Sequence, residues 1–456
     1  MQYEKKVRIG DGSGCAEDRI DAAVEMIERA NLDYMCFDSL SENELSALTI
    51  MKLKNPEAKG YDIQLEDRMG QVLPAALEHK VKVIGNMGST NPVAAMEYVS
   101  GLAIKLGYKG IKVAAVTGDN VRDYLLNSRD IYTVEGHLPV HEFGDKLVAA
   151  NAYISSSPIV EALKNGANVV LTGRVGDSGL FLAPLRYEFG WAENDWDNLA
   201  RGIVVGHQLE CSGQLTGGYY ADPPFKVVEN IHRIGFPFAD VYDNGDIFFS
   251  KTEGTGGLVS VDCCKEQIIY EVHDPSNYIH AEVIADISGV NFEQVAKDVV
   301  KLTGVVKGKP APEKLKVALG VRNGYFATSQ IWYGGPGARG RAEETRKMLY
   351  ARFDYLGYKP DVLSISLLGI NAMFGDAPGV PKNTDPWEVG VRMAARGQNP
   401  KELLDMVRET SKHVNTSSMA GGSCAQSMPA VREVVEYYSV LIPRDAINAK
   451  ITYMGV

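Results

Sequence analysis

Short apolar runs alternate with segments of helical period through the first half of the chain. The apolar runs of strand length are Val7–Ile9, Tyr34–Phe37, Val81–Ile84, Ile111–Val116 and Val169–Thr172. The helical segments are Asp18–Ala30, Asn43–Lys54, Pro92–Leu106, a segment beginning near Val121, and Pro158–Asn165. Uniformly apolar strands alternating with helices are typical of βαβ units whose sheet is covered on both faces. The pattern predicts an α/β fold with a mainly parallel sheet flanked by helices.

The pattern changes after about Gly202. Gly213–Tyr220 is rich in glycine and tyrosine, and the turn Asp243–Asp246 separates two short strands as in a hairpin. Longer strands are predicted at Val283–Val290, Val299–Val305, Lys314–Val321 and Tyr325–Trp332, and helices at Gly256–Val272, Ala342–Tyr355, Asn399–His413 and Gln426–Tyr438. Strands and helices grouped in this way are typical of an α+β domain. We therefore predict two domains, residues 1–215 with an α/β fold and residues 216–456 with an α+β fold on a mixed or antiparallel sheet.

Composition narrows the class of protein. A chain of 456 residues exceeds what one hydrophobic core usually supports, which agrees with two domains. The net charge of −11 disfavours nucleic acid and anionic membranes as partners, because both attract basic surfaces. No apolar run is long enough to span a bilayer, no secretory signal is present, and the six cysteines are scattered as free thiols would be. The sequence predicts a cytoplasmic protein, and we expect a homo-oligomer.

Small polar residues and glycines follow each of the five apolar strands. The candidate site residues in these loops are Asp11, Ser13, Gly14, Asn86, Gly88, Asn91, Asp119, Gly173, Arg174 and Asp177. In open parallel sheets ligands bind outside the carboxyl ends of the strands, where helix N-termini attract anions. The same residue types also form ordinary turns and helix caps, which explain any single loop equally well. Their repetition along one edge favours a shared anion-binding site.

The first glycine-rich loop does not match a nucleotide-binding fingerprint. Its Gly10-x-Gly12-x-Gly14 spacing differs from GxGxxG, and the chain contains no Walker sequence. This loop is the only feature that would support the prediction of a nucleotide-dependent oxidoreductase. The missing Walker sequence disfavours an ordinary NTPase.

His207 and Glu210 are three residues apart in a segment that reads as helical. This spacing places both side chains on one face, where they can form an acid–base pair or bind a metal ion. A buried histidine paired with a carboxylate for structural reasons fits the spacing equally well.

Two further glycine loops have arrangements that suit an anion. Thr255, Gly256 and Gly257 precede a predicted helix and present backbone N–H groups, although plain capping explains them too. Arg339 and Arg341 follow a glycine loop at the start of another helix, where a positive charge is unfavourable unless an anion or a nearby glutamate offsets it. Both readings stay open for each loop.

Several segments spread over the chain, taken together, resemble the sequence of a known protein family. They are Val7–Gly14, Asp33–Asp38, Asn86–Pro92, Gly173–Ser178, Glu188–Trp191, Asp195–Asp197, Gly206–Cys211, Thr216–Tyr219, Gly254–Val259 and Leu441–Asp445. As a set they resemble the acyclic terpene utilisation (AtuA) family over essentially the whole chain. Where the family commonly has alanine after Gly-Arg-Val, this chain has Gly176. The resemblance implies a role in the breakdown of branched isoprenoid acids through coenzyme A thioesters, with a small companion subunit. It supplies no catalytic residues.

These observations predict a lyase of the hydratase or dehydratase type acting on a small carboxylic acid or its coenzyme A thioester. An arginine would hold the substrate carboxylate, and the candidates are Arg174, Arg339 and Arg341. The candidate proton-transfer groups are His207, Glu210, Asp177 and Asp119, with Asp11 as a further acid. Because the acidic residues offer oxygen ligands, a divalent metal such as Mg²⁺ or Mn²⁺ would suit them better than zinc. The alternative is a non-catalytic acyl-CoA-binding or assembly subunit of a catabolic complex.

Overall fold

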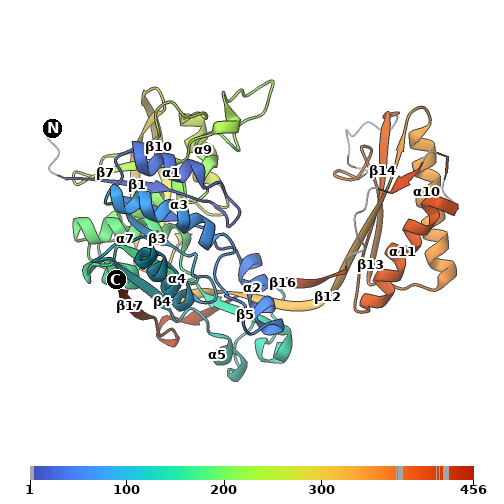
Figure 1. Cartoon of the computed structure of the whole chain (residues 1–456), viewed down its shortest axis with the longest axis horizontal. Helices are drawn as coiled ribbons and strands as arrows, with labels where there is room; N and C mark the ends of the chain where they lie inside the picture. Colours follow the sequence, from blue (N-terminus) through green and yellow to red (C-terminus); the bar gives the residue numbers. More distant parts are fainter. Residues whose placement is uncertain (1–4, 376, 378–383, 417–418, 421, 425–430) are drawn as a thin grey trace. The chain divides into compact units, whose positions relative to one another are not determined.

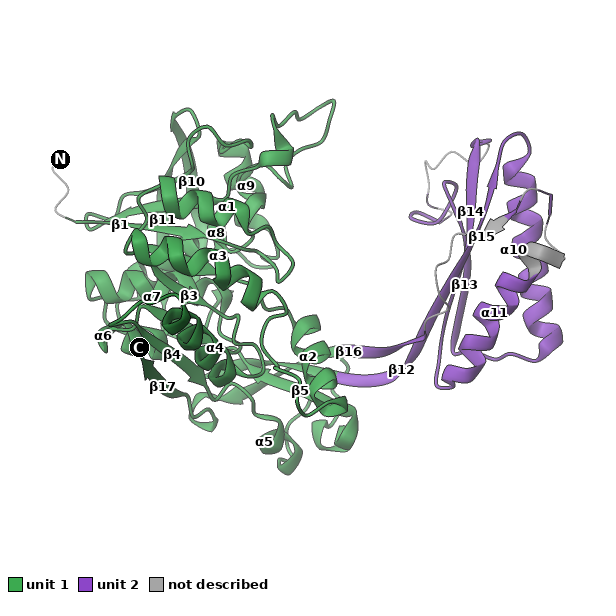
Figure 2. Ribbon diagram, in the orientation of Figure 1, with its two compact units in different colours: residues 1–320, 437–456 green, residues 321–436 purple. Residues whose placement is uncertain are grey.

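The computed structural model describes residues 5–375, 377, 384–416, 419–420, 422–424 and 431–456. The chain divides into two compact units, residues 1–320 with 437–456 (unit 1) and residues 321–436 (unit 2), as Figure 2 shows. It passes between them inside two long strands that pair with each other, β12 (Lys314–Gly334) and β16 (Val431–Pro443).

An eleven-stranded sheet forms the centre of unit 1, in the order β17-β4-β6-β3-β2-β1-β7-β8-β11-β10-β9. Figure 1 labels β1, β3, β4, β7, β10 and β17 of this sheet. Its parallel strands are β1 (Lys6–Asp11), β2 (Tyr34–Phe37), β3 (Lys82–Gly85), β4 (Lys112–Thr117) and β6 (Val169–Thr172). Its antiparallel strands are β7 (Pro237–Tyr242), β8 (Ile247–Lys251), β9 (Tyr278–Ile279), β10 (Ile284–Ala296), β11 (Val299–Lys309) and β17 (Lys450–Gly455). The prediction of mixed helix and sheet is confirmed, but the prediction of a mainly parallel sheet is corrected, because the sheet is mixed.

The change of composition near residue 215 lies inside unit 1. It follows the end of α8 (Trp196–Leu209) and precedes β7, the first strand to pair antiparallel with β1. The predicted hairpin turn at Asp243–Asp246 joins β7 to β8. The compositional change therefore marks a change of strand pairing, whereas the compact units separate further along the chain.

Helices cover both faces of the parallel strands. The described helices of unit 1 are α1 (Asp21–Arg29), α2 (Glu42–Lys54), α3 (Leu65–Glu78), α4 (Pro92–Lys105), α5 (Arg122–Asn127), α6 (Ser157–Lys164), α7 (Asp177–Phe189), α8, and α9 (Val261–Ile269). Met35 and Phe37 of β2 join a core cluster with α1, α3 and α4, whereas Cys36 between them donates to Leu180 O of α7. Successive side chains of a strand point to opposite faces, so α7 lies on the other side of the sheet. None of the described helices is long and apolar enough to cross a bilayer.

In its described residues, unit 2 is an antiparallel sheet packed against two helices. Its elements besides β12 and β16 are α10 (Ala338–Leu356), β13 (Val362–Leu368), β14 (Glu388–Gly397), α11 (Pro400–Thr416) and β15 (Ser423–Cys424). Ile331, Met393 and Phe353 are among the residues of its own hydrophobic cluster. The helix predicted at Gln426–Tyr438 is wrong where it can be checked, since residues from Val431 onward form β16; residues 426–430 lie outside the described part of the chain.

Candidate functional site

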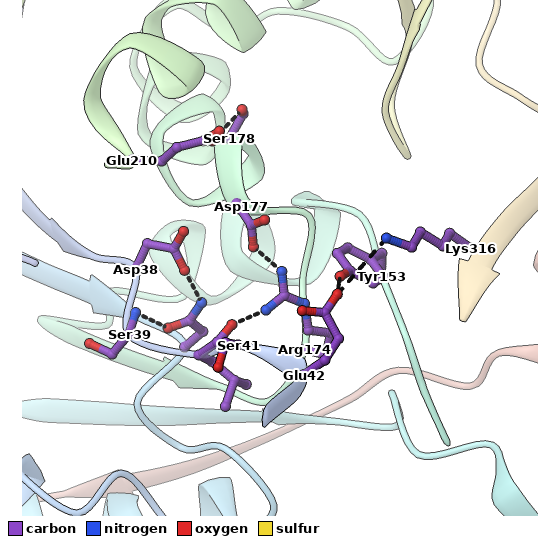
Figure 3. A network of polar contacts seen from close by, with 12 residues as sticks. Asp38, Ser39, Ser41, Glu42, Tyr153, Arg174, Asp177, Ser178, Glu210 and Lys316 are labelled. Atoms are coloured by element: carbon purple, nitrogen blue, oxygen red, sulfur yellow. Dashed lines mark hydrogen bonds and ion pairs between the residues drawn. The ribbon is translucent and has the colours of Figure 1, made fainter. Parts of the chain in front are cut away.

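Side-chain hydrogen bonds tie together the loops after β1, β2 and β3, and Figure 3 shows the part of this network around Asp38 and Ser39. Asn86 accepts a hydrogen bond from the backbone N–H of Ser39 at 2.7 Å and donates one to Asp38 Oδ1 at 2.5 Å. The hydroxyl oxygens of Ser39 and Ser13 lie 2.8 Å apart, which connects the loop after β1. Because parallel strands end at the same edge of a sheet, these residues meet although they are far apart in sequence.

Close packing or helix capping explains several of the loop residues predicted as site residues. A Cβ atom added at any of three glycines would lie within 3 Å of neighbouring backbone or side-chain atoms; they are Gly14, Gly88 and Gly173. At Gly173 the neighbour is the Asp119 carboxylate, at 2.6 Å. Asn91 caps α4 by accepting from Ala94 N at 3.4 Å. These positions bring the loops close together and are explained without a ligand.

Arg174 is almost fully buried and already has partners. Its guanidinium donates to Leu40 O and to the Asp177 carboxylate, and it stacks 4.3 Å above the ring of Tyr153. Its backbone N–H donates to Asp119 Oδ2 at 2.8 Å. These bonds engage the two nitrogens that would bind a substrate carboxylate. Arg174 therefore orients Asp177 and Tyr153.

His207 and Glu210 form the close pair that their spacing predicts. His207 Nδ1 lies 2.9 Å from Glu210 Oε1, and Ser178 donates its hydroxyl hydrogen to Glu210 Oε2 at 2.6 Å. Burial raises the pKa of Glu210, but the hydrogen bonds from His207 and Ser178 outweigh it, and the net effect is a lowered pKa. Tyr278 Oη lies 3.0 Å from the same His207 nitrogen. The Glu210 carboxyl group of this pair is therefore ionised, and the Tyr278 side chain covers the pair.

Carboxyl groups around this edge repel one another. Burial raises the pKa of Asp177 to about 7, with Arg174 opposing the shift and Glu210 adding to it. Burial and the nearby Asp177 also raise the pKa of Asp38. The pKa of Asp11, fully buried at the end of β1, is raised mainly by burial. Asp177, with its pKa of about 7, can change its charge near neutral pH, as a general base or acid must.

Asp177 opens onto a pocket of about 220 Å³ in unit 1. The polar side chains that line it are Tyr153, Asp177, Tyr278, His280, Lys314 and Lys316. Burial lowers the pKa of His280 to about 4, which keeps its ring neutral. Lys316 lies 4.6 Å above the Tyr153 ring and 3.9 Å from the Glu42 carboxylate. The pocket thus combines one titrating carboxyl group, two phenols, a neutral imidazole and two exposed ammonium groups.

The site residues predicted from the sequence do not include Tyr278, His280, Lys314 or Lys316. Tyr278 and His280 are two residues apart, and so are Lys314 and Lys316. In a strand this spacing places both side chains of a pair on the same face. That signal was present in Tyr278-Ile279-His280 and in Lys314-Leu315-Lys316. What the pattern could not show is that β9 and the start of β12 border the same pocket as Asp177.

Thr255, Gly256 and Gly257 border a different pocket, of about 840 Å³, which has no lining residue in common with that of Asp177. The helix that follows begins later, at Val261, and is capped by Ser260. The loop itself packs tightly, since a Cβ at Gly256 would lie 2.0 Å from Asn230 O. Lys251 Nζ donates to Thr255 O at 2.9 Å.

Replacing Gly256 with alanine is expected to lower the free energy of unfolding by about 1–3 kcal/mol, as overpacking does, because the new methyl group meets fixed backbone. Gly70→Ala in α3 is the matched control, since no atom lies within 4 Å of its added Cβ. Urea unfolding followed by circular dichroism measures both. Equal midpoints for the two variants would contradict the packing role of Gly256.

Arg339 and Arg341 belong to unit 2 and have partners there. Arg339 pairs with Glu343 at 2.9 Å and donates to Thr384 O at 2.6 Å. Arg341 donates to Pro336 O at 2.9 Å and Gly334 O at 2.7 Å, which closes the glycine loop over the start of α10. Their binding of a substrate stays a prediction.

Within the described ranges, no three histidine, cysteine, aspartate or glutamate side chains gather closely enough to hold a metal ion. Asp119 receives hydrogen bonds from Asn151 at 2.7 Å and from Arg174 N at 2.8 Å, both on Oδ2. Magnesium or manganese binding therefore stays a prediction.

The fold and the site define an α/β protein with a buried acidic cluster opening onto a pocket that also holds lysines. The family model described as "Acyclic terpene utilisation family protein AtuA" matches residues 7–453, so the chain belongs to the AtuA family. The resemblance found in the sequence is thereby confirmed. Neither the curated proteins nor the solved structures compared with the chain contain a match.

Proposed function

We propose that this chain is a catabolic lyase of the hydratase or dehydratase type that works in the Asp177 pocket. Its substrate is a small carboxylic acid or the coenzyme A thioester of one. Membership of a family named for acyclic terpene utilisation supports a catabolic role. The observation that carries the reaction type is the pocket that Asp177 shares with Lys314 and Lys316, in which burial raises the pKa of Asp177 to about 7. We further propose a cytoplasmic homo-oligomer.

The lysines are the anion-binding groups in this proposal. Lys314 and Lys316 both line the pocket, and each extends from the exposed side of β12. Arg174 is engaged by Leu40 and Asp177, so its role is to hold the catalytic carboxyl group. An ammonium group beside the substrate carbonyl stabilises the negative charge that develops when the neighbouring carbon loses its proton.

Asp177 is the base in the dehydration direction. Its ionised form takes the proton from the carbon next to the carbonyl group, and the electron pair of that C–H bond forms the new C=C bond. The C–O bond on the adjacent carbon breaks, and the hydroxyl group leaves as water after gaining a proton from an acid in the pocket. Hydration is the same sequence reversed, with protonated Asp177 as the acid.

The test uses the smallest branched acids with the five-carbon skeleton of an isoprene unit. 3-Hydroxy-3-methylbutyric acid and 3-methylcrotonic acid, each free and as the coenzyme A thioester, are incubated with the intact chain in D₂O. Proton NMR follows their interconversion and deuterium uptake next to the carbonyl. We expect interconversion of one pair. Saturable binding with neither interconversion nor exchange would contradict the lyase and favour the non-catalytic acyl-CoA-binding alternative.

Lys316→Met is expected to raise KM about tenfold, because a hydrogen bond to a charged group contributes about 1.5–3 kcal/mol. The methionine retains the unbranched stem but lacks the ammonium group. Lys105→Met, at the exposed end of α4, is the control and should leave KM unchanged. Steady-state kinetics on the interconverted pair measure both; an unchanged KM in Lys316→Met would remove Lys316 from substrate binding.

A further inference from the structure

We infer that Tyr278 is the acid that protonates the departing hydroxyl group, and that His207 and Glu210 act through it from behind the pocket wall. This inference rests on the proposed function and adds to it the second proton-transfer group. It also changes the role of His207, which the sequence suggests as a direct catalyst. His207 is 1% exposed and does not line the pocket, whereas Tyr278 does.

The position of Tyr278 is fixed by the rings around it. It lies in the edge strand β9, which pairs with β10 through Tyr278 and Ala285. Its ring meets that of His207 edge-on, with centroids 5.1 Å apart, and that of His280 at 4.4 Å and 88°. Gln267 donates to the backbone carbonyl of His207 at 2.8 Å, which fixes the helix end that carries the imidazole.

The hydrogen bonds around His207 determine where the hydroxyl hydrogen of Tyr278 can point. The pKa of Glu210 is lowered, so its carboxylate accepts only, and it lies 2.9 Å from His207 Nδ1. This nitrogen must therefore carry the hydrogen of that bond. Tyr278 Oη, 3.0 Å from the same nitrogen, faces an N–H and can only accept from it. The phenolic hydrogen is then free to point toward the pocket that Tyr278 lines.

This arrangement suits a donor that must give up its proton during the reaction. Burial raises the pKa of Tyr278, so the hydroxyl group stays protonated until a stronger base, the departing hydroxide, takes the proton. The phenolate that remains accepts a hydrogen bond from the N–H group of His207. His207 stays hydrogen-bonded to the negatively charged Glu210 carboxylate, which also accepts a hydrogen bond from Ser178. Asp177 gains one proton as Tyr278 loses one, and exchange with water in the open pocket restores both.

The direction of the hydrogen bond can be tested without a substrate. The intact chain is labelled with [¹⁵N]histidine, and the His207 signals are assigned by their loss in His207→Gln and their shift in Tyr278→Phe. We expect the Nδ1 of His207 to be protonated near neutral pH. An unprotonated Nδ1 would mean that Tyr278 donates to His207, with its hydrogen turned away from the pocket, and would overturn the inference.

The catalytic role is tested by Tyr278→Phe, which removes the hydroxyl group and keeps the ring. We expect kcat to fall about 10²- to 10⁴-fold, with KM within about threefold of the unmodified chain. Tyr219→Phe, 68% exposed and outside the pocket, is the control and should retain full activity. If Tyr278→Phe keeps its kcat while Asp177→Asn loses it, the inference fails and the proposed function stands. If both keep it, the proposed function fails as well.

Discussion

Asp177→Asn is expected to lower kcat by about 10²- to 10⁴-fold, the usual contribution of a general base or acid. Asparagine has nearly the same shape but does not accept a proton. In the unmodified chain the dehydration rate should rise with pH through about 7, as the Asp177 carboxyl group ionises. The residual activity of the variant should lack this rise. A variant with the same pH profile as the unmodified chain would exclude Asp177 as the titrating group.

The same pKa has a consequence for stability that does not need a substrate. A carboxyl group whose pKa is raised on folding binds more protons in the folded state, so it destabilises the fold as pH rises from its ordinary value of 3.8 to about 7. The free energy of unfolding of Asp177→Asn, relative to the unmodified chain, should therefore increase between pH 4 and pH 7. Urea unfolding at several pH values measures this slope, and a pH-independent difference would argue against the raised pKa.

Arg68→Met is expected to give the largest loss of stability, about 3–5 kcal/mol, as removal of one partner from a buried ion pair does. Arg68 and Asp62 have side chains 0% and 1% exposed and lie 2.7 Å apart. Arg68 also donates to Ser39 Oγ at 3.0 Å and Ala16 O at 2.7 Å, which links the loops after β1 and β2. Methionine fills much of the space but leaves the Asp62 carboxylate without its positive partner.

The loss should grow with pH. Burial raises the pKa of Asp62 while Arg68 opposes the shift, so the variant raises that pKa further. The folded variant then binds an extra proton at low pH, and ionising Asp62 at higher pH costs more stability.

The control is Lys59→Met, whose partner Glu66 is a surface carboxylate with 35% of its side chain exposed. Removing an exposed ion pair should cost under about 1 kcal/mol. Similar losses in the two variants would mean that burial does not set the contribution of Arg68.

The strands that the sequence predicted best are those buried on both faces. Tyr34–Phe37 and Val169–Thr172 are strands with the predicted bounds, because a central parallel strand leaves a continuous apolar run. Helix α3 was missed: it contains Gly70 and Pro74, two residues that weaken a helical pattern, and it is held by burial of Leu65 and Met69 against the sheet. The mixed pairing of the sheet was also missed, since strand order depends on contacts between distant segments.

The site was predictable where it depends on strand ends and helical spacing. The loops carrying Ser13, Ser39 and Asn86 meet as parallel topology requires, and His207 and Glu210 pair as their spacing suggests. The two lysines of the pocket were not predictable, because β12 starts about 140 residues after Asp177 along the chain and reaches the pocket only through folding. The sequence suggested arginines as the groups that hold the substrate carboxylate. In the structure the guanidinium groups of Arg174, Arg339 and Arg341 are hydrogen-bonded to nearby residues of the chain.

A crystal structure of the intact chain soaked with 3-methylcrotonate tests most directly whether the Asp177 pocket is where the substrate reacts. We expect the carboxylate of the acid within hydrogen-bonding distance of Lys314 or Lys316, and its double bond between the Asp177 carboxyl group and the Tyr278 hydroxyl group. The acid bound only beside Thr255, or anywhere away from Asp177, would contradict it.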